Sequence, residues 1–491
     1  MKRDFNSSPD MRAVARRAML DAGFTPDVPG DVLSEVRALP DGHLTPPTDH
    51  ATRDLRSLLW SSIDNVESRD LDQVEFAGRE ANGGIRVMIG IADVDAFAPE
   101  GSATDRHAAK NTTSVYTGVE TYSMLPERLS MGITSLLEGV DRLAIIIDFS
   151  VSGVGAVTSN GIYKALIRNH ARLDYESVGQ WLEGQAPMPE RVAGLPGLED
   201  QLRLQDEVTA RLRELSRQRG ALDIETTEAS PVAVDGKVYG LTIKKKNPAR
   251  HIIENLMVTA NAEMASFLLS NNSPSIQRVV SVPQRWPRIM KIAESFGDAL
   301  PPEPDSRALN DFLARRKASD PDHFPDISLS IVKLLGAGEY VVLPAGGESE
   351  GHFGLAVHDY THSTAPNRRY IDLVIQRLLK AIVAGDAVPY SEAELTEIAA
   401  RCNNRQSAAR KVERLMRKVI AAVVLGNQIG EVFDSIVTGV SGKGTFARLI
   451  SPPAEGRIVR GEGGLDVGDK VKVRLISTTP EKGFIDFERA V

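Results

Sequence analysis

Cysteine and long apolar runs are the two features that this chain almost lacks. Its 491 residues include a single cysteine, Cys402. One thiol cannot form an intrachain disulfide, and it argues against a zinc cluster built on cysteines. No apolar run approaches the roughly 20 residues that span a bilayer, and the first residues carry no apolar signal core. We therefore expect a monomer in the reducing cytoplasm that contacts no membrane.

An overall basic charge is also missing. The formal net charge is −8, which argues against a general nucleic-acid coat protein. The charge is uneven, however: Glu413 alone opposes a basic run formed by Arg401, Arg405, Arg410, Lys411, Arg414, Arg417 and Lys418. Lys244–Lys246 and Arg250 form a second basic cluster. Solvated helix faces explain most such runs, but beside an acidic segment they favour a polyanionic substrate bound with a metal ion.

That acidic segment runs from Ser62 to Gln73. Asp70 and Asp72 are two residues apart, so on an extended chain they point to the same side. Asp64 reaches the same point if the polar turn between them folds back. Converging carboxylates repel one another and favour a hard cation such as Mg²⁺ or Mn²⁺. Taken alone, the spacing is more typical of a solvated turn than of a metal site.

Residues 1–45 predict a small helical domain. Asp10 can cap a helix over Met11–Asp21, and a second short helix follows Pro29. Two short helices joined by a turn are compatible with a helix-turn-helix and with duplex nucleic-acid contact, although any helical cap has the same pattern. Residues 42–49, rich in Pro and Thr, predict a linker.

Residues 50–430 predict an α+β domain, because strands and helices follow without regular alternation. The expected strands are Val74–Ala77, Ile85–Ile91 and Leu143–Phe149, and the expected helices are 197–218, 249–269, 370–384 and 392–428. Residues 431–491 contain five short strands with Gly-rich turns, which predict an OB barrel that binds oligonucleotides. Phe433 and Phe446 could stack on bases there or belong to the barrel core.

Several motifs of the central region follow one another in a fixed order. They are Ile91–Val94, Ser114–Tyr116, Met124–Ser130, Gly139–Ala144, Ala171–Tyr175, Arg219–Asp223, Ile253–Met257, Gly351–Ala356 and Tyr360–Tyr370. Together with the acidic segment, this series resembles the ribonuclease II / ribonuclease R family of exoribonucleases, whose catalytic part is the RNB domain. The last strands resemble the RNA-binding domain that closes many members.

The resemblance assigns roles to individual residues. It implies that Asp64, Asp70 and Asp72 hold Mg²⁺, or Mn²⁺ in its place, and that Asp72 also orients the nucleophilic water. Arg368 would clamp a phosphate through its planar guanidinium.

Further positions match residues that contact RNA in relatives. Tyr175 and Glu254 match positions near the RNA 3′ end, where catalytic assistance and plain packing are equal alternatives. Tyr116 would stack on a base, and Phe446 would contact RNA from the barrel. His362 is expected to be a structural hydrogen-bonding residue.

The chain departs from the family pattern at defined positions. Gln73 replaces the usual last aspartate, which removes a charge from the metal site. Gly90 and Gln376 replace usual histidines, and Asn367 replaces a usual isoleucine. The roughly 45 residues before the catalytic region are too few for an OB fold. We therefore expect either a weaker grip on single strands or a wider entrance that tolerates structured RNA.

Three functions follow from these observations. The first is a processive 3′→5′ exoribonuclease that releases nucleoside 5′-monophosphates from single-stranded RNA. The second is a catalytically weakened RNA-binding relative, disabled by Gln73. The third is a nucleic-acid-binding regulator that acts through the N-terminal helices.

Overall fold

The computed structural model describes residues 10–40, 52–225, 229–234, 237–243, 246–321, 324–442 and 444–490, with the backbone alone for 229–234 and 237–243. The expected linker at 42–49 and two residues of the second basic cluster, Lys244 and Lys245, lie outside these ranges. No helix among the described residues is long and apolar enough to cross a membrane.

The catalytic region is built on one curled sheet. Its strands lie in the order β1 (Arg53–Asp54), β8 (Val157–Asp174), β2 (Trp60–Asp64), β3 (Gln73–Arg79), β4 (Ile85–Ala92) and β7 (Asp141–Val151). The long strand β8 pairs antiparallel with β7 in its first half and parallel with β2 in its second half, so the sheet closes on itself. Gly83, at φ +83°, makes the turn between β3 and β4.

Helices cover this sheet in the positions expected from the sequence. Helix α6 (Leu198–Arg219) packs on β3, and α7 (Pro248–Ser270) packs on α6 and on α4 (Tyr175–Leu182). The remaining elements of the region are α3 (Ala103–Asn111), β5 (Val115–Tyr116), β6 (Thr121–Tyr122), the π-helix η1 (Arg128–Ile133), α5 (Glu190–Ala193), β9 (Ala229–Val234), β10 (Lys237–Ile243), β11 (Ser275–Val279), β12 (Glu339–Leu343), η2 (Phe353–Leu355) and α11 (Tyr370–Ala384).

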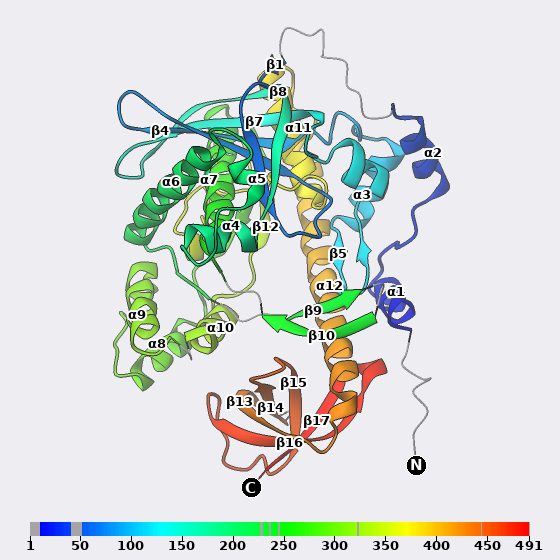
Figure 1. Ribbon diagram of the computed structural model, residues 1–491, viewed down its shortest axis with the longest axis vertical. Helices are drawn as coiled ribbons and strands as arrows, with labels where there is room; N and C mark the ends of the chain where they lie inside the picture. Colours follow the sequence, from blue (N-terminus) through cyan, green and yellow to red (C-terminus); the bar gives the residue numbers. More distant parts are fainter. Residues whose placement is uncertain are drawn as a thin grey trace.

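Helix α12 (Glu392–Leu425) joins the two ends of the molecule (Figure 1). It begins with a capping box in which Ser391 and Glu394 bond each other's backbone. The last turns of α12 pack against the apolar core of a closed barrel. The strand order of the barrel is β13 (Val432–Ser441), β14 (Gly444–Leu449), β15 (Glu455–Arg460), β17 (Phe484–Arg489) and β16 (Lys470–Thr479). The short helix η3 (Gly426–Gln428) precedes β13, and η4 (Pro480–Lys482) connects β16 to β17. The predicted five-stranded barrel is therefore confirmed.

The two N-terminal helices exist as predicted, but they pack on different partners. Met11, Ala15 and Met19 of α1 (Met11–Asp21) lie in one apolar cluster with α12. The helix α2 (Gly30–Ala38) packs on α3, where Glu35 accepts the N–H groups of Ala103 and Thr104 at 2.7 and 3.1 Å. In a helix-turn-helix the two helices pack on each other. Here α1 packs on α12 and α2 packs on α3 instead.

A separate group of helices forms a small satellite core below the sheet. It consists of α8 (Trp286–Ser295), α9 (Ser306–Ser319) and α10 (Phe324–Leu335), which bury Trp286, Phe312 and Phe324 against one another. The sequence did not single out this group.

The segment before α11 is anchored by stacked rings. The rings of Tyr360 and His362 meet edge to face at 5.8 Å, and Tyr340 bonds His362 Nδ1 through its hydroxyl at 2.9 Å. His352 meets the Tyr360 ring at 5.5 Å and accepts the Leu355 N–H at 3.1 Å. His362 is thus a structural hydrogen-bonding residue, as expected.

We expect acid to destabilise the fold through these histidines. Burial lowers the pKa of His352 to about 4, and it lowers the pKa of His362 well below its usual range. Between about pH 6.5 and 4 the unfolded chain therefore binds more protons than the native chain. The free energy of unfolding consequently decreases as the pH is lowered through this range. Denaturant titrations at pH 7.5 and 5 measure this loss. The variant His352→Gln should lose less stability between these two pH values than the wild type. The variant His358→Gln, which changes an exposed histidine, should lose as much as the wild type. Equal losses in the wild type and both variants contradict the prediction.

Candidate active site

The acidic segment lies where β2 ends and β3 begins. Asp64 is the last residue of β2, and its Oδ1 accepts the N–H of Asn65 at 2.7 Å and the hydroxyl of Ser68 at 2.9 Å. These bonds fold the chain back toward Asp70, which confirms the turn that the sequence required. Arg172 closes the turn from β8 by donating to the carbonyl of Ser68 at 2.7 Å.

Asp72 and Arg368 form the centre of the site. Asp72 is 2% exposed, and its Oδ2 lies 3.2 Å from Arg368 Nε. Its Oδ1 accepts the Asn367 N–H at 3.0 Å, so the tip of the acidic segment is bonded to the segment before α11. Burial raises the pKa of Asp72 to about 7, and the charge of Asp70 adds to the rise while Arg368 opposes it. Arg368 is thus the countercharge of a buried carboxylate.

Asp70 connects Asp64 to Asp72 electrostatically. Burial raises its pKa, Asp64 raises it further by repulsion, and Arg368 opposes both effects. The three predicted carboxylates therefore lie near one another on one short segment. Among the described residues, however, no three carboxylate, imidazole or thiol groups converge tightly enough to form a finished metal site.

The donor set still suits a hard divalent cation. Carboxylate oxygens are the ligands that Mg²⁺ and Mn²⁺ prefer, and Asp70 and Asp72 sit in surroundings that penalise their negative charge. A cation between them would relieve that penalty. The assignment of Asp64, Asp70 and Asp72 as metal ligands remains a prediction.

Two tyrosines flank the carboxylates. Backbone bonds from Ser114 to the carbonyl of Arg368 and from Tyr370 to the carbonyl of Thr112 bring the strand of Tyr116 beside Arg368. Tyr116 is 45% exposed, which leaves its ring accessible. On the other side Tyr175 begins α4, and the Arg250 guanidinium lies 4.4 Å from the centre of its ring. The roles of both tyrosines toward RNA stay predictions.

Glu254 and Phe446 are not brought to the carboxylates. Lys246 donates to both oxygens of Glu254 at 3.0 Å, in a pair on the outer side of α7. Glu254 is one helical turn beyond Arg250, so it lies at the margin of the site. Phe446 is half-buried on β14 of the barrel. Their roles toward RNA stay predictions.

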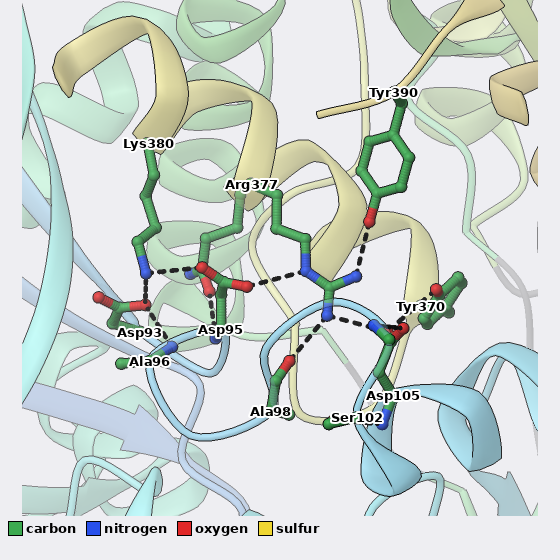
Figure 2. A network of polar contacts seen from close by, with 12 residues as sticks. Asp93, Asp95, Ala96, Ala98, Ser102, Asp105, Tyr370, Arg377, Lys380 and Tyr390 are labelled. Carbon is green, nitrogen blue, oxygen red and sulfur yellow. Dashed lines mark hydrogen bonds and ion pairs between the residues drawn. The ribbon is translucent and has the colours of Figure 1, made fainter. Parts of the chain in front are cut away.

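A polar network holds α11, and with it Arg368, against the sheet (Figure 2). Arg377 lies 2.8 Å from Asp95 and 2.9 Å from Asp105, and it donates to the hydroxyl of Tyr390 at 2.6 Å. Lys380 pairs with Asp93 and Asp95, each at 2.8 Å. The Ile91–Val94 motif is thus structural: it anchors the helix that follows the signature segment.

Two departures from the family pattern fit their surroundings. A Cβ at Gly90 would lie 3.0 Å from Val74 Cγ2 and 3.1 Å from Ile167 Cδ1, so a histidine has no room there. Gln376 accepts the Asp95 N–H at 3.1 Å and donates to the Ala92 carbonyl at 2.8 Å. Both positions therefore serve packing rather than chemistry in this chain.

The sequence alone did not identify three further residues in this part of the structure. Arg250 contacts Tyr175, and Asn367 buries its side-chain Nδ2 beside Asp72 without a partner in the described structure. Glu75 is a carboxylate on a strand position that is fully buried. Only Glu75 carries a signal in the sequence, because an acid there interrupts the apolar pattern of the strand.

Comparison with known proteins matches both parts of the chain. Residues 52–385 match the RNB domain, and residues 431–490 match the RNase II-type exonuclease C-terminal S1 domain. Ribonuclease R 1 of Lactococcus lactis is 28% identical over 94% of this chain and 59% of its own length. Ribonuclease R of Escherichia coli is 30% identical over 81% of this chain and 49% of its own length. The chain thus spans about half the length of these relatives.

Solved structures share the fold. The apo form of Mycoplasma genitalium RNase R superposes with a TM-score of 0.86 at 22% identity, covering 98% of this chain and 78% of that one. Yeast Ssd1, a pseudonuclease, superposes with a TM-score of 0.70 at 18% identity, covering 95% and 57%. The RNB match takes in more than half of the chain, Asp72 and Arg368 included, and the chain therefore belongs to the RNB family.

Proposed function

We propose that this chain is a processive 3′→5′ exoribonuclease of the cytoplasm, which hydrolyses single-stranded RNA to nucleoside 5′-monophosphates. The observation that carries the proposal is the ion pair of buried Asp72 and half-exposed Arg368 beside Asp64 and Asp70. A guanidinium next to carboxylates supports binding of a phosphate together with a cation. Relatives named Ribonuclease R support the same assignment.

Metal dependence follows from the same carboxylates. Nucleases of this family are generally dependent on divalent metal. We assign Mg²⁺, with Mn²⁺ as a substitute, to Asp64, Asp70 and Asp72. A bound ion neutralises charge that develops on phosphorus and makes a coordinated water more acidic.

The chain's own residues bind and orient the RNA. Arg368 is 42% exposed while its Nε is held by Asp72, so its outer nitrogens can donate to the oxygens of the scissile phosphate. Asp72 fixes the plane of that guanidinium and orients the attacking water with its carboxylate. Tyr116 offers an accessible ring for base stacking, and the Tyr175 hydroxyl faces the last nucleotide.

A second function rests on Gln73. This residue begins β3 and is buried, and it brings no charge where the family usually has an aspartate. The fold itself is compatible with lost activity, since yeast Ssd1 is called a pseudonuclease and shares it. In that case the chain would bind RNA without cutting it.

The two functions separate in a time course with a 5′-labelled single-stranded oligoribonucleotide and Mg²⁺. We expect progressive shortening from the 3′ end and its loss in Asp72→Asn, by about 100-fold or more, because the variant removes charge that orients Arg368 and the water. Asp434→Asn is a control on the far barrel, where the carboxylate is exposed. Binding without shortening, in wild type and Asp72→Asn alike, establishes the second function instead.

Polarity and sugar specificity are tested with modified ends. A blocked 3′ terminus, or deoxynucleotides at that terminus, should stop degradation, because an exonuclease must seat the free end and read its 2′-hydroxyls. Gel analysis of products from the two modified oligomers and the plain one measures this. An all-DNA oligomer cut as fast as RNA contradicts the substrate assignment.

Structured RNA tests the width of the entrance. The helix α1 packs on α12, and α2 packs on α3. Our proposal extends to structured RNA: a duplex with a 3′ overhang is degraded into its paired region. Stalling several nucleotides before the duplex, visible as a fixed limit product, shows that the entrance is narrow.

A further inference from the structure

Arg278 is a buried arginine for which the described residues supply no countercharge. It lies on β11 and is 7% exposed. Its Nη1 donates to Gln406 Oε1 at 3.0 Å, and its guanidinium lies 4.7 Å from the centre of the Tyr340 ring. Both partners are neutral. A guanidinium keeps its proton in proteins, and a buried charge without a counterion is costly, so this group points to an anion that binds there.

Two further arginines add positive charge around Arg278. Burial lowers the pKa of Arg278, and the charges of Arg410 and Arg369 lower it further. The Nη2 of Arg369 donates to Asp372 at 2.7 Å, while its Nε is buried with no hydrogen-bond partner in the part of the chain that the structure describes. The carboxylate of Asp372 is therefore engaged by Arg369 rather than by Arg278.

Helix α12, which runs beside β12 and β5 (Figure 1), brings Arg410 next to Arg278. Gln406 of this helix bonds Arg278. Two turns later, about 10 Å along the axis, Glu413 Oε1 accepts the Tyr116 N–H at 3.2 Å. Arg410 is four residues after Gln406 and three before Glu413, so it lies on the same face of the helix between them. It is exposed there.

This face of α12 connects Arg278 with the candidate active site. Tyr116 carries the ring that we propose for base stacking, and the N–H of Ser114 on the same segment donates to the carbonyl of Arg368 at 3.0 Å. An RNA strand that leaves Arg368 past Tyr116 therefore reaches Arg410 within about one helical turn. Each nucleotide of such a strand brings one negative charge, which is the anion that the arginines lack.

We propose that Arg278 and Arg410 form a second phosphate site, which binds an RNA phosphate on the 5′ side of the scissile one. The inference rests on the proposed function, because RNA is its ligand. Gln406 and Tyr340 fix the plane of the Arg278 guanidinium, and the exposed Arg410 completes the site when RNA binds. Both arginines are positioning residues that hold the strand while Arg368 holds the scissile phosphate.

Neutral phosphate analogues test this site through RNA binding by the whole chain. Fluorescence anisotropy without divalent metal measures the affinity for 5′-labelled oligoribonucleotides, each with one methylphosphonate at a successive position from the 3′ end. In the wild type we expect binding to weaken about 10-fold at one position 5′ of the last phosphate, because a charge-assisted hydrogen bond is lost. In Arg278→Gln and Arg410→Gln, plain RNA should bind about 10-fold more weakly, and the analogue at that position should cause no further loss.

The salt dependence of binding gives a second measurement. For single strands the slope of log K against log salt is about −0.7 per neutralised phosphate, so Arg410→Gln should reduce its magnitude by about 0.7. Arg288→Gln is the matched control, because Arg288 is an exposed arginine on α8. Its affinity, its slope and its response to each analogue should equal those of the wild type.

The outcomes separate this inference from the function on which it rests. An Arg410→Gln protein that keeps the wild-type response to every analogue overturns the second phosphate site. An Arg278→Gln protein that melts at a lower temperature but binds plain RNA as tightly as the wild type also overturns it, since the guanidinium is then structural. Both results leave the nuclease intact if the wild type shortens RNA with Mg²⁺. A wild type that shows the expected binding pattern without shortening RNA supports the site and overturns the nuclease.

Discussion

The buried contact between Asp72 and Arg368 is the interaction on which the site depends. It joins residues 296 positions apart, and it gives the buried carboxylate of Asp72 a countercharge from a half-exposed arginine. The Asn367 N–H completes the contact through the second oxygen of Asp72. Asp72 and Arg368 both lie on irregular segments, so each depends on the regular element that follows it. Asp72 directly precedes β3, and Arg368 lies just before α11.

The rest of the fold fixes these two elements relative to each other. Salt bridges from Arg377 and Lys380 bind α11 to the loop that follows β4, the hairpin partner of β3. Thus the network in Figure 2 ties the helix that follows Arg368 to the loop after β4, and β4 pairs with β3. The helix α12 extends the same framework to the barrel, and α1 packs along it with Met19. Each charged group of the site is therefore held by packing that starts elsewhere in the chain.

The departures from the family pattern are of two kinds. At Gly90 an added Cβ would lie 3.0 to 3.1 Å from its nearest neighbours, and Gln376 makes two hydrogen bonds. At Gln73 the amide brings no charge, and at Asn367 the side-chain Nδ2 has no hydrogen-bond partner in the described structure. The first two positions fit their surroundings through packing and hydrogen bonds, whereas the last two lie at the carboxylates of the candidate site.

The sequence by itself determined the elements and the charge pattern. It located the four expected helices to within three residues, the closing barrel, the turn at Asp64 and the acidic segment, since these follow from local periodicity and from ordered motifs. Only the tertiary structure decided which distant groups meet. It packed α1 on α12 and α2 on α3, paired Glu254 with Lys246, and buried Glu75 on β3. The reason is physical: burial and electrostatic coupling depend on contacts between segments, and a local pattern contains no information about the partner that packs against it.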